Sequence, residues 1–233
     1  MSPKRIRPTG QPTRGKTALN RLRQVDTYVT LSWSNVLTYG KPLVVDLGFG
    51  AQAWTALEMY NHWLPLNSNL RLLGVEIDLE RVTNALPYQE LGVIEFRLGG
   101  FNLVDVMGTD KARIIRAYNV LRQYDEPAVK NALQEMGAAL EVGGLLIEGT
   151  STPSGRIVAF DIYRKAENGS LSHQELVFGT NLKEIAAPTH FQTILPKRLF
   201  HHMLDETPKM FFDSWRQAMI LARATGQTSL RQQ

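Results

Sequence analysis

The sequence predicts an α/β protein with a doubly wound, mostly parallel sheet and an antiparallel hairpin at one sheet edge. Three observations predict this fold. Apolar stretches of strand length alternate with stretches of helical periodicity over residues 43–148. A glycine-containing turn joins the first of these strands to a helix. Only seven residues, 149–155, separate the fifth strand from the sixth. A parallel crossover needs a dozen or more residues, so the sixth strand must return antiparallel.

The individual elements follow from periodicity and from their end signals. Apolar residues at three- and four-residue steps predict a helix over 17–37, which Gly40 and Pro42 end. Asp125 and Pro127 are a helix start, and Asn168 with Gly169 is a hairpin turn. The remaining predicted strands are 43–45, 70–78, 93–98, 113–118, 145–148, 156–163 and 175–178, the remaining helices are 53–64, 79–89 and 125–140, and helix predominates after residue 181.

Composition limits the class of protein. The 233 residues are 43% hydrophobic and 21% charged, which is ordinary globular usage. The chain has no cysteine, which excludes disulfides and thiolate metal sites and fits a reducing cytoplasm. No apolar run approaches the ~20 residues of a membrane span, so we expect no membrane partner. We expect a single α/β domain over residues 17–233, ending in a helical segment.

The positive charge is concentrated at the N-terminus. Seven Lys and Arg residues precede the first acid, Asp26, and the rest of the chain has 19 basic and 22 acidic residues. A basic arm can bind phosphate backbones. Prolines and glycines accompany these charges, however, and no aromatic residue is interleaved for base stacking. We therefore expect residues 1–16 to be a disordered, solvated arm.

The glycine turn is the main functional signal. Asp46, Gly48 and Gly50 lie between a buried strand and a helix, where backbone N–H groups face a ligand. The same residues match the dinucleotide pattern G-x-G-x-x-G/A, but a carboxylate at Asp46 would repel a pyrophosphate. The Asp-x-Gly-x-Gly arrangement resembles motif I of the class I S-adenosylmethionine-dependent methyltransferases. A dinucleotide site, and a turn that binds nothing, remain alternatives for this stretch alone.

A second acid supports the resemblance. Glu76 ends the second strand, 26 residues after Gly50, at the sheet edge where doubly wound proteins bind ligands. Residues 73–78 are similar to motif II of the same family. That resemblance implies that Glu76 accepts hydrogen bonds from the ribose of S-adenosylmethionine, with Ile77 beside it. Asp78 competes for this role, but we expect it to cap the next helix.

The sequence departs from the family at three places. The third strand ends in Gly99, Gly100 and Phe101, where the family often has an acid near the adenine amino group. The resemblance then leaves the Gly100 backbone and the Phe101 ring as the adenine contacts, although Phe101 fits a core position equally well. Gln52 stands at the third glycine of motif I and is expected to narrow the pocket. The family's usual helix after the fifth strand is also missing.

The end of the fourth strand resembles motif IV, which touches methyl donor and acceptor. There Asn119 is the candidate for the amino acid part of the donor, and Arg122 for an anionic or aromatic substrate. The Asp-Pro-Pro-Tyr tetrapeptide is absent, so methylation of adenine N6 or glutamine loses support. No histidine pair has metal-ligand spacing, and we expect no metal. The candidate catalytic residues are Asn119, Tyr124 and Glu148, and the candidate substrate contacts are Tyr124, Glu148, Ser151 and His190.

The resemblance implies S-adenosylmethionine-dependent methyl transfer to an acceptor that the sequence does not identify. A small molecule is favoured slightly over RNA, because the chain after the arm is acidic. A non-catalytic Rossmann-like protein that binds nucleic acid or a protein partner is the alternative. An NAD-dependent oxidoreductase is a weaker one, because Asp46 argues against it.

Overall fold

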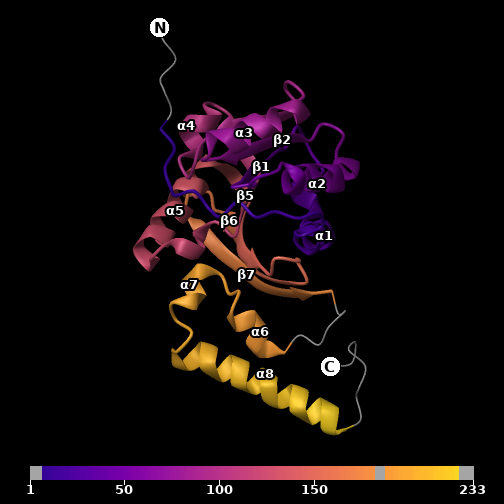
Figure 1. The fold of residues 1–233 in the computed structure, drawn as a ribbon, viewed down its shortest axis with the longest axis vertical. Coiled ribbons are helices and arrows are strands. Elements are labelled where there is room, and N and C mark those ends of the chain that lie inside the picture. Colours follow the sequence, from indigo (N-terminus) through magenta and orange to yellow (C-terminus); the bar gives the residue numbers. More distant parts are fainter. Residues whose placement is uncertain (1–6, 182–186, 226–233) are drawn as a thin grey trace.

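A computed structural model describes residues 7–181 and 187–225 (Figure 1). Within them, a seven-stranded sheet has the order β3-β2-β1-β4-β5-β6-β7. Strands β1 to β5 are parallel, and β6 and β7 are each antiparallel to the strand before. The predicted fold class is confirmed. The strands are β1 (Leu43–Leu47), β2 (Arg71–Glu76), β3 (Ile94–Leu98), β4 (Ala112–Tyr118), β5 (Leu140–Ser151), β6 (Ile157–Lys165) and β7 (Leu171–Thr180).

The chain enters the sheet at its centre. From β1 it proceeds outward through β2 to β3, then returns across β1 to β4 and β5. The strand order therefore reverses between β1 and β4, and ligands of open α/β sheets bind at the carboxyl ends of the strands at such a point. The short link 152–156 carries no helix, and Glu148 pairs with Asp161 across the antiparallel β5–β6 ladder.

Helices connect the parallel strands and cover both faces. Their bounds are α1 (Arg23–Ser32), α2 (Trp54–Trp63), α3 (Leu79–Ala85), α4 (Leu103–Met107), α5 (Glu126–Ala139), α6 (Pro188–Gln192), α7 (Lys197–Phe200) and α8 (Glu206–Ala224). The 3-10 turns are η1 (Ser34–Val36), η2 (Leu64–Leu66), η3 (Leu86–Tyr88) and η4 (Leu121–Gln123). The α1 helix begins later than residue 17, since Asn20 has a φ of 61°, which a right-handed helix does not accept.

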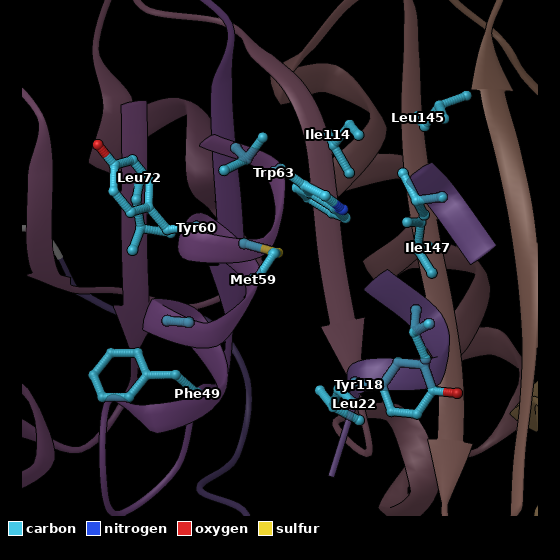
Figure 2. Packing of buried hydrophobic residues seen from close by; sticks show 14 of the residues in the cluster. Leu22, Phe49, Met59, Tyr60, Trp63, Leu72, Ile114, Tyr118, Leu145 and Ile147 are labelled. Carbon is cyan, nitrogen blue, oxygen red and sulfur yellow. The ribbon is translucent and has the colours of Figure 1, made fainter. Parts of the chain in front are cut away.

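Alternating strand residues divide the core between the two faces. Leu72, Ile114 and Ile147 pack against Met59 and Trp63 of α2 on one face (Figure 2). Strand neighbours of opposite orientation pack against α4 and α5 on the other; they include Val45, Leu73, Ile115 and Leu146. This two-sided burial is the reason the inner parallel strands are mainly apolar in the sequence.

The C-terminal helices form a separate cluster. Phe191, Ile194 and Leu195 pack with Ala159 of β6 and Phe212 of α8. In Figure 1 these helices lie below β7, on the far side of the sheet from β2 and β3. The predicted helical content after residue 181 agrees with this cluster for the residues described.

Residues 7–16 differ from the expected disordered arm. They lie along the carboxyl edge of the sheet, and we call them the strap. Thr9 accepts a hydrogen bond from Phe101 N at 3.0 Å, and Gly15 accepts one from Ala51 N at 2.9 Å. The side chains of Tyr124 and Arg81 hold the strap between these points. The expectation rested only on the composition of the strap. The residues that hold the strap in place are distant from it in the sequence. Residues 1–6 lie outside the described part of the chain.

Candidate functional site

The β1–α2 turn has the backbone geometry that its glycines permit. Gly48 and Gly50 have φ values of 75° and 88°, in the region that side chains rarely adopt. Gly48 N donates to Val75 O at 2.7 Å, which joins the turn to β2. A Cβ atom on Gly50 would lie 2.9 Å from Gly15 O, so the turn also leaves room for the strap.

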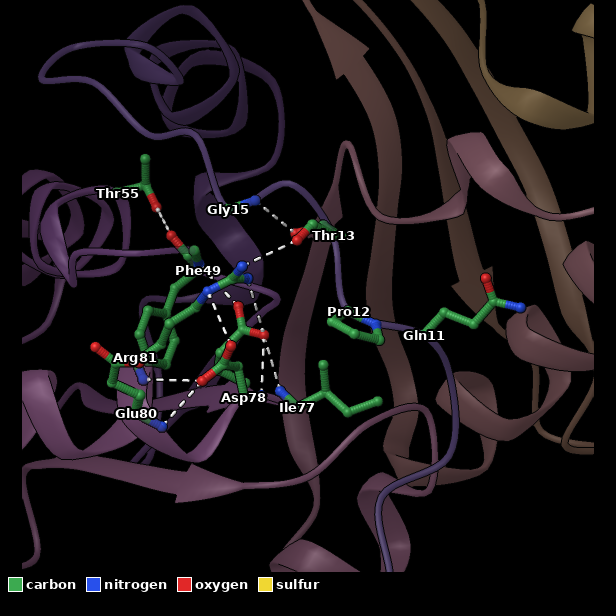
Figure 3. A network of polar contacts seen from close by, with 12 residues as sticks. Gln11, Pro12, Thr13, Gly15, Phe49, Thr55, Ile77, Asp78, Glu80 and Arg81 are labelled. Carbon is green, nitrogen blue, oxygen red and sulfur yellow. Dashed lines mark hydrogen bonds and ion pairs between the residues drawn. The ribbon is translucent and has the colours of Figure 1, made fainter.

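Glu76 meets this turn directly. Glu76 is only 1% exposed. Its carboxylate accepts hydrogen bonds from Gly50 N at 3.0 Å and from Ile77 N at 2.9 Å. Arg81 approaches the same carboxylate at 3.5 Å and donates to Thr13 O of the strap at 2.9 Å. Figure 3 shows the strap passing beside Ile77, Asp78 and Arg81. Glu76 is therefore fixed by backbone donors and held next to the strap.

Asp78 has the capping role predicted for it. It precedes α3 and accepts hydrogen bonds from Glu80 N at 2.9 Å and Arg81 N at 3.3 Å. A helix N-cap satisfies donors that have no intrahelical partner. Of the two acids at this strand end, Asp78 is thus already engaged as the N-cap of α3.

Two adjoining cavities lie at the carboxyl ends of the strands. The larger has a volume of about 490 Å³, and Asp46, Gly48, Gly50 and Asn119 are among its lining residues. The smaller holds only about 20 Å³ and is lined by residues that include Gly48, Glu76, Ile77, Gly100 and Phe101. Thr13, Gly48 and Val120 border both cavities. All eight residues that the sequence assigns to the cofactor therefore border one of these two spaces.

The strap fills the side of the site next to Glu76. Thr9, Gly10 and Gln11 line the smaller cavity opposite Gly100 and Phe101. A nucleoside bound against Glu76 needs far more than 20 Å³, so these strap residues would have to move. The donor and acceptor groups suit a nucleoside with a ribose diol, because a carboxylate and the backbone of Gly100 border one space. The residues thus fit such a group once the strap is displaced.

Asp46 is part of a buried ionic network. Its carboxylate accepts from Arg116 Nε at 3.0 Å and from Thr55 Oγ1 at 3.1 Å. Arg116 is fully buried and also binds Asp26 at 2.5 Å. Burial raises the pKa of Asp26 to about 6, against the attraction of Arg116. The pKa of Arg116 is itself raised, because the two carboxylates outweigh the effect of burial. The Asp46 carboxylate is therefore engaged in an ion pair with Arg116, which it shares with Asp26.

Asn119 sits at the junction of β4 and β5. It has a φ of 61°, and its side chain accepts from Ser151 N at 3.0 Å and donates to Ser151 Oγ at 3.2 Å. Its backbone N–H donates to Gly149 O at 2.7 Å. Both Asn119 and Ser151 line the larger cavity. Hydrogen bonds between the two residues fix the floor of that cavity.

Tyr124 and Phe101 lie on the strap side. The Tyr124 hydroxyl accepts from Gln11 N at 2.5 Å, and its ring meets that of Phe101 edge-on at 5.3 Å. Phe101 is buried in the core cluster on the α4–α5 face and also borders the smaller cavity. Its core role and its place at the site are therefore both present.

Glu148 does not join the other candidate catalytic residues. It lines neither cavity and faces Asp161, which Arg198 of α7 binds at 2.8 Å through two nitrogens. Burial, and then the charge of Asp161, raise the pKa of Glu148 to about 8. Side chains alternate between the two faces of a strand. Glu148 therefore points to the same α5 side as Leu146, whereas Ser151, at the end of β5, borders the cavity.

Two further expectations about the site differ from the structure. His190 is exposed on α6 and lines neither cavity, so it does not join Ser151. The helix α6 packs against β6 and α8 instead of folding over the glycine turn. Gln52 does not line either cavity and so does not narrow them.

Sequence reasoning named Arg122 as a contact for an anionic substrate but missed the other basic residues of the larger cavity. Arg14 and Lys16 of the strap line it together with Arg21, and Arg122 faces them from the end of β4. The concentration of positive charge at the N-terminus could have indicated them. Because residues 1–16 were expected to be disordered, Arg14 and Lys16 were not considered part of the site. In the described ranges, no group of three or more His, Asp or Glu residues is placed to hold a metal ion, and no helix is long and apolar enough to cross a membrane.

No protein-family model and no curated protein matches this sequence. Solved structures do resemble it. A candidate sarcosine dimethylglycine methyltransferase from Galdieria sulphuraria aligns over 55% of this chain and 47% of its own, with 14% identity and a TM-score of 0.40. A candidate protein-L-isoaspartate O-methyltransferase from Plasmodium falciparum, in complex with S-adenosyl-L-homocysteine, aligns over 67% and 70%, with 14% identity and a TM-score of 0.43.

A candidate rRNA methylase from Clostridium thermocellum is also similar, over 57% of this chain and 70% of its own, with 15% identity and a TM-score of 0.39. The names of these three structures are those of methyltransferases, and at such identities the likeness is one of fold.

Proposed function

We propose that this protein binds S-adenosylmethionine at the two cavities and transfers its methyl group to a small acceptor molecule. The observation that carries the proposal is the contact between the glycine turn and the acid of β2. Gly50 N lies 3.0 Å from Glu76 Oε2, at the edge of the sheet where the strand order reverses. One ligand could thus contact the turn and the carboxylate together.

Each part of the site has a role in this proposal. Glu76 and the Gly100 backbone would hold the nucleoside, while Gly48, Gly50 and Asn119 would border the amino acid part. When bound, S-adenosylmethionine would supply an electrophilic methyl group: an acceptor lone pair forms a bond to the methyl carbon as the carbon–sulfur bond breaks, and S-adenosylhomocysteine is the leaving group. The protein would contribute mainly by holding the acceptor in the larger cavity, because proximity and orientation lower the barrier of such a displacement.

The first experiment is a calorimetric titration with S-adenosylhomocysteine and, in parallel, with NAD. We expect binding of the first only. Glu76→Ala should weaken that binding by about 1.5–3 kcal/mol, the range for hydrogen bonds to an ionised group. Glu80→Ala is the matched control, since it removes the same charge from an exposed position on α3. Unchanged affinity in Glu76→Ala, or a larger loss in Asp78→Ala, would refute the assignment of the ribose to Glu76.

A non-catalytic role is the second candidate, and the strap is the observation that favours it. Thr9 to Gln11 occupy the space a nucleoside would need, so a permanently closed strap would leave no cofactor site. A chain lacking residues 1–12 separates the two. If neither the full chain nor this truncation binds S-adenosylhomocysteine, the protein is not a methyltransferase. Binding by the full chain contradicts the non-catalytic proposal, whereas binding by the truncation alone is the result that a permanently closed strap predicts.

A further inference from the structure

The larger cavity has an unbalanced positive charge. Arg14, Lys16, Arg21 and Arg122 line it. The only acid in its lining, as far as the described residues go, is Asp46. The Asp46 carboxylate is bound by Arg116 and Thr55, and a single paired carboxylate leaves most of the charge of these four cations unbalanced.

The contacts of Arg21 show that its charge is not neutralised by a carboxylate. Arg21 Nε donates to Ser151 Oγ at 3.0 Å, and Nη1 donates to Lys16 O at 2.5 Å. Both partners are neutral. Burial, and then the positive charge of Arg122, lower the pKa of Arg21. Within residues 7–181 and 187–225, no acidic partner of Arg14, Lys16 or Arg122 is found either. An anion that enters the cavity therefore meets several cations that have no acidic partner among the described residues.

The methyl donor alone does not account for this charge. S-adenosylmethionine carries a single carboxylate together with an ammonium and a sulfonium, so its net charge is positive. One carboxylate could pair with at most one or two of the four cations. We propose that the larger cavity binds the phosphate group of a small phosphorylated methyl acceptor, with Arg21 and Arg122 as its principal ligands. This inference rests on the proposed function of the same site.

Two features favour a small molecule over single-stranded RNA. The cavity volume of about 490 Å³ lies within the range of small-ligand pockets. Proteins that bind single strands also stack bases on accessible aromatic rings. The aromatic residues that line this cavity are Phe49 and Tyr118, which are 3% and 5% exposed and pack in the core. The guanidinium groups of Arg21 and Arg122 suit phosphate, because each presents several donors in one plane.

The strap has a function in this inference. It brings Arg14 and Lys16 into the lining of the cavity, so these two charges of the N-terminal segment belong to a folded site. The hydrogen bonds from Ala51 N to Gly15 O and from Arg21 Nη1 to Lys16 O hold this part of the strap in place. The basic residues would then recognise the acceptor inside the cavity.

The test is a calorimetric titration of the full chain with inorganic pyrophosphate at low salt. We expect binding that Arg122→Gln and Arg21→Gln each weaken by about tenfold or more, since each removes charge-assisted hydrogen bonds. Arg216→Gln is the matched control. It removes the same charge from an exposed position on α8, where Arg216 pairs with Asp213. Thermal melts of the variants check that they remain folded.

Three results would overturn the inference. One is absence of pyrophosphate binding, and another is equal affinity of wild type and Arg122→Gln. The third is tighter binding of a short single-stranded oligoribonucleotide than of pyrophosphate, with the same arginine dependence. The S-adenosylhomocysteine titration keeps this test separate from the proposed function. If the nucleoside binds and pyrophosphate does not, only this inference fails. If pyrophosphate binds and the nucleoside does not, the anion site stands and its role in methyl transfer falls.

Discussion

The carbonyl oxygen of Thr9 lies 1.8 Å from the position that a Cβ atom on Gly100 would take. No side chain fits at Gly100 while the strap is in place. The same backbone stretch forms the hydrogen bond from Phe101 N to Thr9 O. The glycine that replaces the expected acid at the end of β3 thus has a physical explanation, because it lets the strap approach the sheet edge.

Gly100→Ala should therefore displace the strap. We expect a destabilisation of about 1–3 kcal/mol, typical of overpacking, measured by urea unfolding. The amide of Phe101 should also exchange faster with solvent. The control is the same substitution in a chain without residues 1–16, where it should cost almost nothing. Equal costs in the two backgrounds would show that the strap does not contact Gly100 in solution.

Removal of residues 1–12 tests whether the strap limits access to Glu76. This deletion removes Thr9 to Gln11 but keeps Arg14 and Lys16. We expect S-adenosylhomocysteine to bind more tightly, because the full chain must first spend free energy to open the smaller cavity. A chain lacking only residues 1–6 is the matched control and should bind like the full chain. Weaker binding by the longer deletion would mean that the strap contributes to the cofactor site.

Arg116→Met tests the network beneath the glycine turn. Asp26 and Asp46 would lose their shared cation while both remain buried. The loss of one partner from a buried ion pair costs about 3–5 kcal/mol. We expect a loss of this size in the free energy of unfolding at pH 7, and a smaller one near pH 5, where Asp26 becomes protonated more readily. Arg216→Gln, on the surface of α8, is the reference. A loss below 1 kcal/mol would contradict the network.

Glu148→Gln tests the carboxyl that burial keeps protonated. The folded-state pKa of Glu148 is about 8, above its ordinary value of 4.5. The folded state therefore binds a proton that the unfolded state releases, so this group lowers stability as the pH rises from about 4.5 to about 8. The glutamine variant lacks this loss. We expect it to match wild type at pH 4.5 and to exceed it by a few kcal/mol at pH 8.5.

Urea unfolding at several pH values measures this difference. Asp26, whose pKa is also raised, contributes equally to wild type and variant and cancels from the comparison. A variant that is less stable than wild type at pH 8.5 would show that Glu148 is ionised and bound by Arg198 in the folded state.

The sequence by itself determined the sheet and one edge of the site. Apolar segments located the central strands, because strands buried on both faces are mainly apolar. The turn signal of Asn168 and Gly169 pointed to the largely unburied β7. The short link between the fifth and sixth strands, seven residues as predicted and 152–156 in the structure, determined the direction of β6 by its length alone. The positions of Asp46, Gly48, Gly50 and Glu76 followed in turn, since parallel strands have their carboxyl ends at one edge.

Only the tertiary structure decided which of these side chains are available to a ligand. Asp46 forms an ion pair with Arg116, 70 residues away in the sequence, and no local sequence pattern indicates such a pair. Glu148 faces Asp161 and α7, although it ends a predicted strand at the right edge. Contacts with Phe101, Tyr124 and Arg81 order the strap. Its composition, which suggested disorder, gives no sign of these contacts. Long-range contacts set the charge and the free volume of the site, because both depend on which distant residues pack against it.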